Sequence, residues 1–299
     1  METKYKFIIN DKKQNLPPGA KISFLPEKLI SLSLPEFCPP FEIICPIESR
    51  ATLYIHSPNN SMAQIHLSLE ANCHLELATT SLSTQITATL TKNATLNIVI
   101  INDKTTNAKN NIEVNLNGQN ASASINGLYS LKNEEQADNN ITIRHNSPHT
   151  ESNLYFKGIL DDHAYANYVG NIIIEKGSSK SISQQSNKNL LLSSTAHINA
   201  RPVLEILNDD VKCSHGATVG DINQDELFYL QSRGINKENA KKIIYHAFAR
   251  EIITKVNSHE LRKLLNNNLA LSFDRYRTDS LDNSLVEADR CLHGQHSFT

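Results

Sequence analysis

Short runs of alternating apolar and polar residues dominate the sequence between about residues 41 and 220. Clear examples are 64–69 (QIHLSL), 111–116 (NIEVNL) and 140–143 (NITI). Successive side chains of a strand point to opposite faces, so each run predicts one row of side chains in a core and one in solvent. The runs recur about every 10–12 residues, a spacing typical of an all-β domain.

Turn chemistry helps to choose among a sandwich, a barrel and a β-solenoid, which the alternation alone leaves open. The chain has only 10 glycines, and Asn-Gly pairs occur only at Asn117-Gly118 and Asn126-Gly127. A hairpin-rich sandwich usually needs more residues that adopt positive φ. A solenoid can instead turn on the Asn, Ser and Thr that are abundant here. The sequence therefore favours a parallel β-helix.

Prolines set the first segment apart. Residues 1–40 contain six of the 10 prolines of the chain. Because proline fixes φ and lacks a backbone N–H, this density disfavours long helices and central strands. We therefore expect an irregular lead-in to the β-helix.

The pattern becomes helical after about residue 221. Asn223 is a good N-cap residue with Glu226 completing a capping box, and Gly234 is a natural end for this first helix. Asn236 then caps a second helix. Its apolar residues recur at helical spacing and are Ala240, Ile243, Ile244, Ala247, Phe248 and Ile252.

The remaining pattern completes a division of the chain into three parts. A third helix is expected over about 258–268, and the polar tail after about residue 276 is expected to be loose. We therefore predict an irregular segment at 1–40, a β-helix core at 41–220 and a small C-terminal helical domain at 221–299.

Charge and composition argue against nucleic acid as a partner. Lys and Arg number 29 against 31 Asp and Glu, and Trp is absent. Nucleic-acid binders usually carry a concentrated basic patch and aromatic platforms for bases. Neither feature is visible in this sequence.

The N-terminus and the cysteines indicate the compartment. No run of about 18 apolar residues predicts a membrane span, and the first residues show neither an apolar h-region nor a small-residue cleavage site. The five cysteines are odd in number and form no CxxC, which favours free thiols in a reducing compartment. We expect a cytoplasmic protein without a membrane partner.

The segment 212–218 (KCSHGAT) carries the sharpest chemical feature of the chain. If the segment is extended, Cys213 and His215 point to the same side. A thiolate and an imidazole together suit iron or zinc, but two ligands are too few for a closed tetrahedral site. The rest would come from a partner chain, a small molecule or distant residues. On spacing alone, a buried cysteine beside a structural histidine is the commoner explanation.

Motifs of common enzymes are missing from the sequence. It contains no HExxH and no GxSxG, and the segment 177–181 (GSSKS) lacks the glycine–lysine step of a phosphate loop. Asp209 and Asp210 are adjacent, so in a strand they would point to opposite faces and make a poor acid–base pair. We therefore expect that the protein is not an enzyme.

The stretch 201–251 strongly resembles the C-terminal core of the SufB/SufD family of iron–sulfur cluster assembly proteins. The pieces LEI, DDVKCSHGATVG, LFYL and SRGI are more similar to SufD than to SufB. Weaker similarity extends upstream through 138–158, the step 157–160 (KGIL) and 170–172 (GNI). The resemblance implies a right-handed β-helix followed by a helical domain, in agreement with the pattern of the residues.

The resemblance also implies a function as a non-catalytic scaffold subunit. SufD-like proteins pair with SufB through their β-helices, and the helical regions bind the SufC ATPase. The iron–sulfur cluster is assembled near the SufB–SufD interface, where the family places Cys213 and His215, so the cluster would be transient and shared. We expect Phe228, Tyr229 and Arg233 to contact the ATPase, and a homodimer is the alternative assembly.

The sequence departs from the family pattern in two places. SufD chains usually carry a helical region before the β-helix, where this sequence has about 40 irregular residues. The aromatic-x-Gly step of the family reads Tyr168-Val169-Gly170 here.

The solenoid pattern alone would also fit a cytoplasmic β-helix enzyme acting on carbohydrate, or a self-assembling structural solenoid. Against the latter, we expect the helices to cap the stack and block polymerisation.

Overall fold

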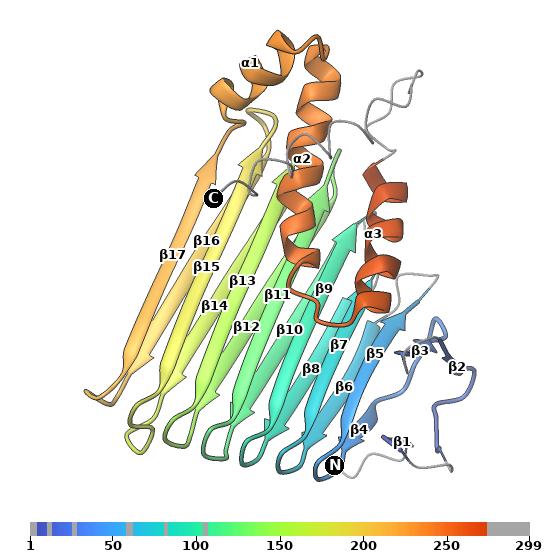
Figure 1. Ribbon diagram of the computed structural model, residues 1–299, viewed down its shortest axis with the longest axis vertical. Coiled ribbons are helices and arrows are strands. Elements are labelled where there is room, and N and C mark those ends of the chain that lie inside the picture. Colours follow the sequence, from blue (N-terminus) through green and yellow to red (C-terminus); the bar gives the residue numbers. More distant parts are fainter. Residues whose placement is uncertain are drawn as a thin grey trace, which may run out of the picture.

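The computed structural model describes residues 5–10, 14–25, 29–57, 62–80, 83–103 and 107–273, and in this part strands precede three helices (Figure 1). The strands are β1 (Tyr5–Ile8), β2 (Lys21–Phe24), β3 (Leu29–Ser33), β4 (Phe41–Cys45), β5 (Arg50–His56), β6 (Met62–Leu69), β7 (His74–Thr80), β8 (Ser83–Leu90), β9 (Thr95–Asp103), β10 (Asn107–Leu116), β11 (Ser122–Leu131), β12 (Gln136–His145), β13 (Glu151–Leu160), β14 (Tyr165–Ile174), β15 (Ile182–Leu191), β16 (His197–Ile206) and β17 (Lys212–Gly220). The helices are α1 (Gln224–Ser232), α2 (Lys237–Ile253) and α3 (His259–Phe273).

The strands form two sheets. The even sheet has the order β1-β4-β6-β8-β10-β12-β14-β16, and the odd sheet has the order β17-β15-β13-β11-β9-β7-β5-β3-β2. From β4 onward the chain alternates between the sheets, so each pair of consecutive strands adds one coil to a stack. The ladders are parallel, except for β2 against β3. The prediction of a mainly β, solenoid-like fold followed by helices is confirmed.

Turn residues explain how the coils close with so few glycines. A left-handed backbone conformation is adopted at turns by non-glycine residues, several of which are asparagines. Asn72, Asn93, Asn120 and Asn133 all have φ between 57° and 60°. Asparagine tolerates this region better than other residues that carry a Cβ atom. By contrast, the Asn126-Gly127 pair is not a turn, because it lies inside β11.

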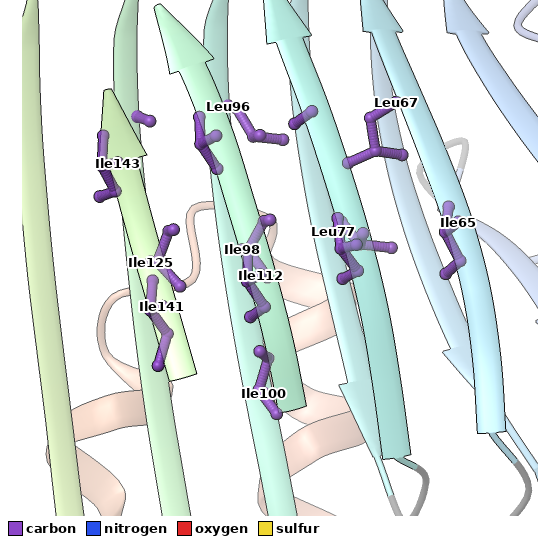
Figure 2. Close-up of a cluster of buried hydrophobic side chains, with 14 of the residues drawn as sticks. Ile65, Leu67, Leu77, Leu96, Ile98, Ile100, Ile112, Ile125, Ile141 and Ile143 are labelled. Carbon is purple, nitrogen blue, oxygen red and sulfur yellow. The ribbon is translucent and has the colours of Figure 1, made fainter. Parts of the chain in front are cut away.

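The core lies between the two sheets and is filled by one residue in two from each strand. Figure 2 shows its centre, where isoleucine and leucine side chains from successive coils stack on one another, among them Ile98, Ile112, Ile125 and Ile141. These four side chains are at most 1% exposed. Since each buried aliphatic side chain contributes roughly 1.5–3 kcal/mol, the stacked rows are the main source of stability of the fold.

α1 and α2 begin where the sequence predicts and α1 ends there, whereas α3 continues to Phe273, beyond the predicted end near residue 268. The Asn223 side chain accepts hydrogen bonds from the backbone N–H groups of Asp225 and Glu226, and Asn236 caps α2 by accepting from Asn239. After α1, Gly234 has a φ of 87°, and its N–H donates to the carbonyl of Gln231. This is the left-handed glycine that commonly terminates a helix.

α2 and α3 cover the outer face of the odd sheet, α1 lies beyond the ends of β15 and β17, and none of the three caps the end of the stack (Figure 1). This corrects the expectation that they would block polymerisation. The physical reason is a patch of apolar side chains on the outer face of the odd sheet, including Val99, Leu128 and Ile159, against which the helices pack. The buried face of α2 is also rotated from the predicted stripe, since Ala247 is exposed whereas Tyr245 and Ala249 are buried.

The N-terminal segment contributes short strands to both sheets. β1 pairs with β4 at the edge of the even sheet, and β3 pairs with β5 in the odd sheet. β2 then lies antiparallel to β3. The segment thus extends the stack by parallel and antiparallel pairing, although its prolines led us to expect irregular structure. The loose tail predicted after residue 276 lies outside the described residues.

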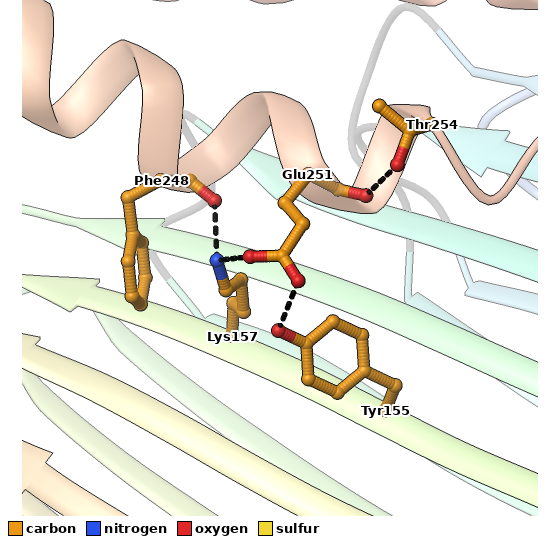
Figure 3. Close-up of polar contacts among 5 residues, drawn as sticks. All are labelled: Tyr155, Lys157, Phe248, Glu251 and Thr254. Atoms are coloured by element: carbon orange, nitrogen blue, oxygen red, sulfur yellow. Dashed lines mark hydrogen bonds and ion pairs between the residues drawn. The ribbon is translucent and has the colours of Figure 1, made fainter. Parts of the chain in front are cut away.

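Buried polar groups fix α2 on the sheet (Figure 3). The Lys157 side chain on β13 is 3% exposed, and its ammonium forms an ion pair with Glu251 on α2. It also donates to the Phe248 carbonyl at 2.9 Å, while Tyr155 donates to Glu251 at 2.8 Å. Burial lowers the pKa of Lys157, and Glu251 opposes that shift. An ammonium so fully desolvated depends on its partner.

Replacing Glu251 with alanine should lower the free energy of unfolding by about 2 kcal/mol, because it leaves the Lys157 ammonium buried without its counter-ion. The figure is below the usual cost of breaking a fully buried pair because Glu251 is 45% exposed. Urea denaturation measures the change. Glu113→Ala is the matched control, since it breaks the exposed pair with Arg144 and should cost below about 0.5 kcal/mol. Equal losses in the two variants would contradict the prediction.

Candidate functional site

The structure places Cys213 and His215 on β17, the edge strand at one end of the odd sheet. In the parallel register with β15, Cys213 is the partner of Ser183 and His215 is the partner of Gln185. Ser183 and Gln185 are buried and face the interior of the stack. The two candidate ligands therefore continue inward-facing rows, on one common face, at the end where the stack stops.

The environment of Cys213 keeps its thiol protonated in the isolated chain. Cys213 is half-buried against the core, and this burial raises the pKa of the thiol above its usual value, although a hydrogen bond with the Ser183 backbone acts in the opposite direction. Since the thiolate is the form that binds metals, binding of a metal at Cys213 must release a proton.

The residues around this pair do not complete a metal site within the described ranges. No group of three or more His, Cys, Asp or Glu residues in them is arranged to hold a metal ion. Cys45 and Cys73 are buried near the opposite end of the stack, on or beside β4 and β7. Cys291 lies outside the described residues. Cys213 and His215 thus offer two ligands on an open edge.

The interior beneath this edge is polar, which the alternation pattern did not predict. The inward row of β15 consists of Ser183, Gln185, Asn187 and Asn189, each at most 3% exposed. Corresponding rows in earlier coils are mainly aliphatic. The signal was present, because 182–189 (ISQQSNKN) is polar at both phases of the alternation, but polarity at both phases is also what an exposed loop shows.

A buried histidine extends this polar region into the stack. His145 is 0% exposed, and its ring nitrogens lie 2.8 Å from the Thr150 and Ser152 hydroxyls. Ser152 in turn lies 2.7 Å from the hydroxyl of Ser183, the residue in register with Cys213. Burial lowers the pKa of His145 to about 4.

The buried ring makes stability depend on pH. The unfolded chain, with a histidine pKa near 6.5, binds a proton more readily than the folded chain between pH 6.5 and 4. The contribution of the neutral His145 ring to the free energy of unfolding is therefore fully present above pH 6.5 and is lost as the pH falls toward 4. The loss between pH 7 and 5 is about 2 kcal/mol. Urea denaturation at these two pH values should show this loss in the wild type and a flatter profile in His145→Gln. Replacing the exposed His197 with glutamine is the control, and parallel profiles for all three proteins would contradict the assignment.

The predicted partner contacts lie on α1, beside the ends of β15 and β17 (Figure 1). Phe228 is 72% exposed and Tyr229 is 51% exposed, whereas Leu227 and Leu230 of the same helix are buried. The Arg233 guanidinium lies 5.3 Å from the centre of the Tyr229 ring, within the range of a cation–π contact. The two exposed aromatic residues thus form an apolar surface on the outside of this helix.

A surface hollow of about 360 Å³ lies where the turns before β15 and β17 meet. Its lining includes Lys180, Ser181, Asp209, Asp210 and Lys212. The two adjacent carboxylates are exposed to solvent. The hollow gives no support to a carbohydrate-cleaving site.

Comparison with known proteins adds an independent finding. A family model described as "SUF system FeS cluster assembly, SufBD core domain" matches residues 49–248. The iron–sulfur cluster assembly protein SufD of Escherichia coli is 37% identical over 155 residues, which are 52% of this chain and 37% of that protein. SufD of Bacillus subtilis is 34% identical over 132 residues, 44% of this chain and 30% of that protein. A SufBD family protein of Synechocystis is 41% identical over 126 residues, 42% and 28% of the two chains.

The matched region contains every candidate residue. It begins beside β5 and reaches into α2, so that Cys213, His215 and the exposed face of α1 lie inside it. The chain spans about a third of the length of these relatives. In the part of the chain that the structure describes, no helix has both the length and the apolar character needed to cross a membrane.

Proposed function

Because the chain belongs to the SufBD core family, we propose that it is a SufD-like, non-catalytic scaffold subunit of a complex that assembles iron–sulfur clusters. The observation that carries the proposal is the position of Cys213 and His215 on an open edge strand inside the family core. Two ligands on an edge suit a site that a second chain completes. The cluster is the cargo of this complex and is held transiently.

The free edges of β16 and β17 support pairing with a SufB-like β-helix. Each of these strands ends its sheet, so within the described residues its outer row of backbone N–H and C=O groups has no neighbouring strand. Such an edge is a template for pairing with another chain. A partner that continues the stack would cover Cys213 and His215 and supply the missing ligands. A second copy of this chain is the alternative occupant.

The exposed aromatic residues of α1 support contact with a SufC-like ATPase. Phe228, Tyr229 and Arg233 follow the C-terminal end of β17, whereas Cys213 is the second residue of that strand. An ATPase that binds α1 would therefore act on the cluster site through β17, the strand that joins the two. Nucleotide binding would shift the paired β-helices and reshape the site. The proposal keeps the cytoplasmic location expected from the sequence.

Co-expression tests the proposal directly. The chain is produced with a SufB-like subunit alone, with a SufC-like ATPase alone, and with both. We expect co-purification in all three cases, and a visible absorption band of an iron–sulfur cluster in the samples that contain the SufB-like subunit. Failure to retain either partner would refute the proposal. Recovery of a stable dimer of this chain alone would favour the homodimer.

A further inference from the structure

The side-chain amide of Gln185 is held in a site shaped for it. It is 3% exposed, and its Nε2 lies 3.1 Å from the carbonyl oxygen of Gly170 and 3.3 Å from the hydroxyl of Tyr168. A Cβ atom on Gly170 would lie 2.1 Å from Nε2. The absence of a side chain at Gly170 is therefore what allows the amide to cross the interior from β15 to β14.

The neighbouring groups identify which atom of the amide is the nitrogen and which is the oxygen. The Gly170 carbonyl can only accept a hydrogen bond, so the atom beside it must be the NH2 group. The other atom is therefore Oε1, which is buried and has no hydrogen-bond donor within the described residues. A buried acceptor without a partner costs roughly 1–3 kcal/mol, so a donor is to be expected.

Among the residues in register with Gln185 and Gly170, one side chain can donate. In the coil below, Gln185 is in register with Leu154 and Gly170 is in register with Ile141, and both of these side chains are apolar. In the coil above, the corresponding residues are His215 and Pro202. Proline has no N–H, whereas the imidazole of His215 always carries at least one.

We propose that Gln185 is a positioning residue for His215. In the structure the His215 side chain is exposed and no donor among the described residues reaches Oε1. Turning the ring toward the interior row lets one imidazole N–H donate to Oε1 and fixes the nitrogen that carries the proton. The second nitrogen then keeps its lone pair for iron. Metal-binding histidines commonly have such a partner on the other nitrogen. The hydrogen bond itself is independent of the proposed function, but its purpose in iron binding rests on that function.

Nuclear magnetic resonance of the isolated chain with ¹⁵N-labelled histidine rings tests the contact. The His215 ring is assigned by its loss in His215→Asn. We expect a ring N–H signal protected from exchange with solvent and a nuclear Overhauser contact with the Gln185 side-chain amide. Gln185→Met should abolish the protected signal. Gln184→Met is the matched control, because Gln184 is the adjacent residue on β15 and is exposed, and it should keep the signal.

The outcomes separate this inference from the proposed function. An unprotected His215 ring in the wild type, with water filling the acceptor, would overturn the inference, as would a signal that survives Gln185→Met. If Gln185→Met does not fold, the Overhauser contact in the wild type decides alone. In the complex with the SufB-like subunit, Gln185→Met should weaken iron retention about tenfold, with Gln184→Met unchanged. If the His215–Gln185 contact is observed but the complex retains no iron, the proposed function is refuted and the inferred contact still holds.

Discussion

Replacing Cys213 and His215 together with alanine is expected to lower the iron and sulfide retained by the reconstituted complex by at least about tenfold. Loss of a partner that only orients a metal ligand already costs about 10–100-fold, and this double variant removes two ligands. Folding should be preserved, since β17 is an edge strand whose side chains are mostly exposed. Iron and labile sulfide analysis measures the loss, and the melting temperature of the isolated chain checks the folding.

The control for this experiment lies on the same strand. Ser214 and Thr218 alternate with the inward row and are exposed, so replacing both with alanine changes β17 to a similar extent without touching the two ligands. This control should retain iron and sulfide at the wild-type level. Unchanged cluster content in the Cys213 and His215 variant would show that these residues are structural.

Replacing Gly127 with alanine is expected to lower the free energy of unfolding by about 3 kcal/mol. Gly127 on β11 is in register with Phe156 on β13, and a Cβ atom at Gly127 would lie 2.0 Å from the Phe156 ring. The ring is 1% exposed inside the stack, so relieving the clash requires movement of the core or of the strands. Urea denaturation measures the loss.

Two further variants identify the clash as the cause. Gly177→Ala should change stability little, because no atom lies within 4 Å of the added Cβ. Phe156→Leu removes the ring that the added Cβ atom meets. It should therefore lower the free energy of unfolding less in the Gly127→Ala background than alone, and a double-mutant cycle measures the difference. Additive effects of the two substitutions would show that the ring is not what the alanine meets.

The same packing explains three of the ten glycines. Gly158 lies against the Tyr129 ring, and Gly170 lies against the Gln185 amide and the Tyr168 hydroxyl. Bulky interior side chains thus occupy the space that the glycines leave empty on neighbouring strands. The sequence shows these glycines, and resemblance to the family drew attention to two of them. Neither revealed which ring or amide fills each gap, because the partners lie on different strands.

Local patterns were sufficient for the elements and the fold class. Alternation with period two predicted the strands, and the abundance of turn-forming asparagine favoured a solenoid. Asn223, Asn236 and Gly234 indicated where helices begin or end. These signals act between residues a few positions apart, which is why they can be read along the chain. For the same reason, the i and i+2 spacing of Cys213 and His215 placed them on one face as soon as β17 was extended.

Only the tertiary structure decided what those faces meet. The sequence did not show that α2 and α3 lie over the odd sheet, away from the edge strand with Cys213 and His215. Nor did it show that Lys157 is buried and paired with Glu251. It also did not show that Gln185 lies in register with His215. These relations depend on the register between coils about 30 residues apart and on which apolar face is left for the helices. The register is set by the length of every intervening turn and by the packing of the whole stack, so no local pattern contains it.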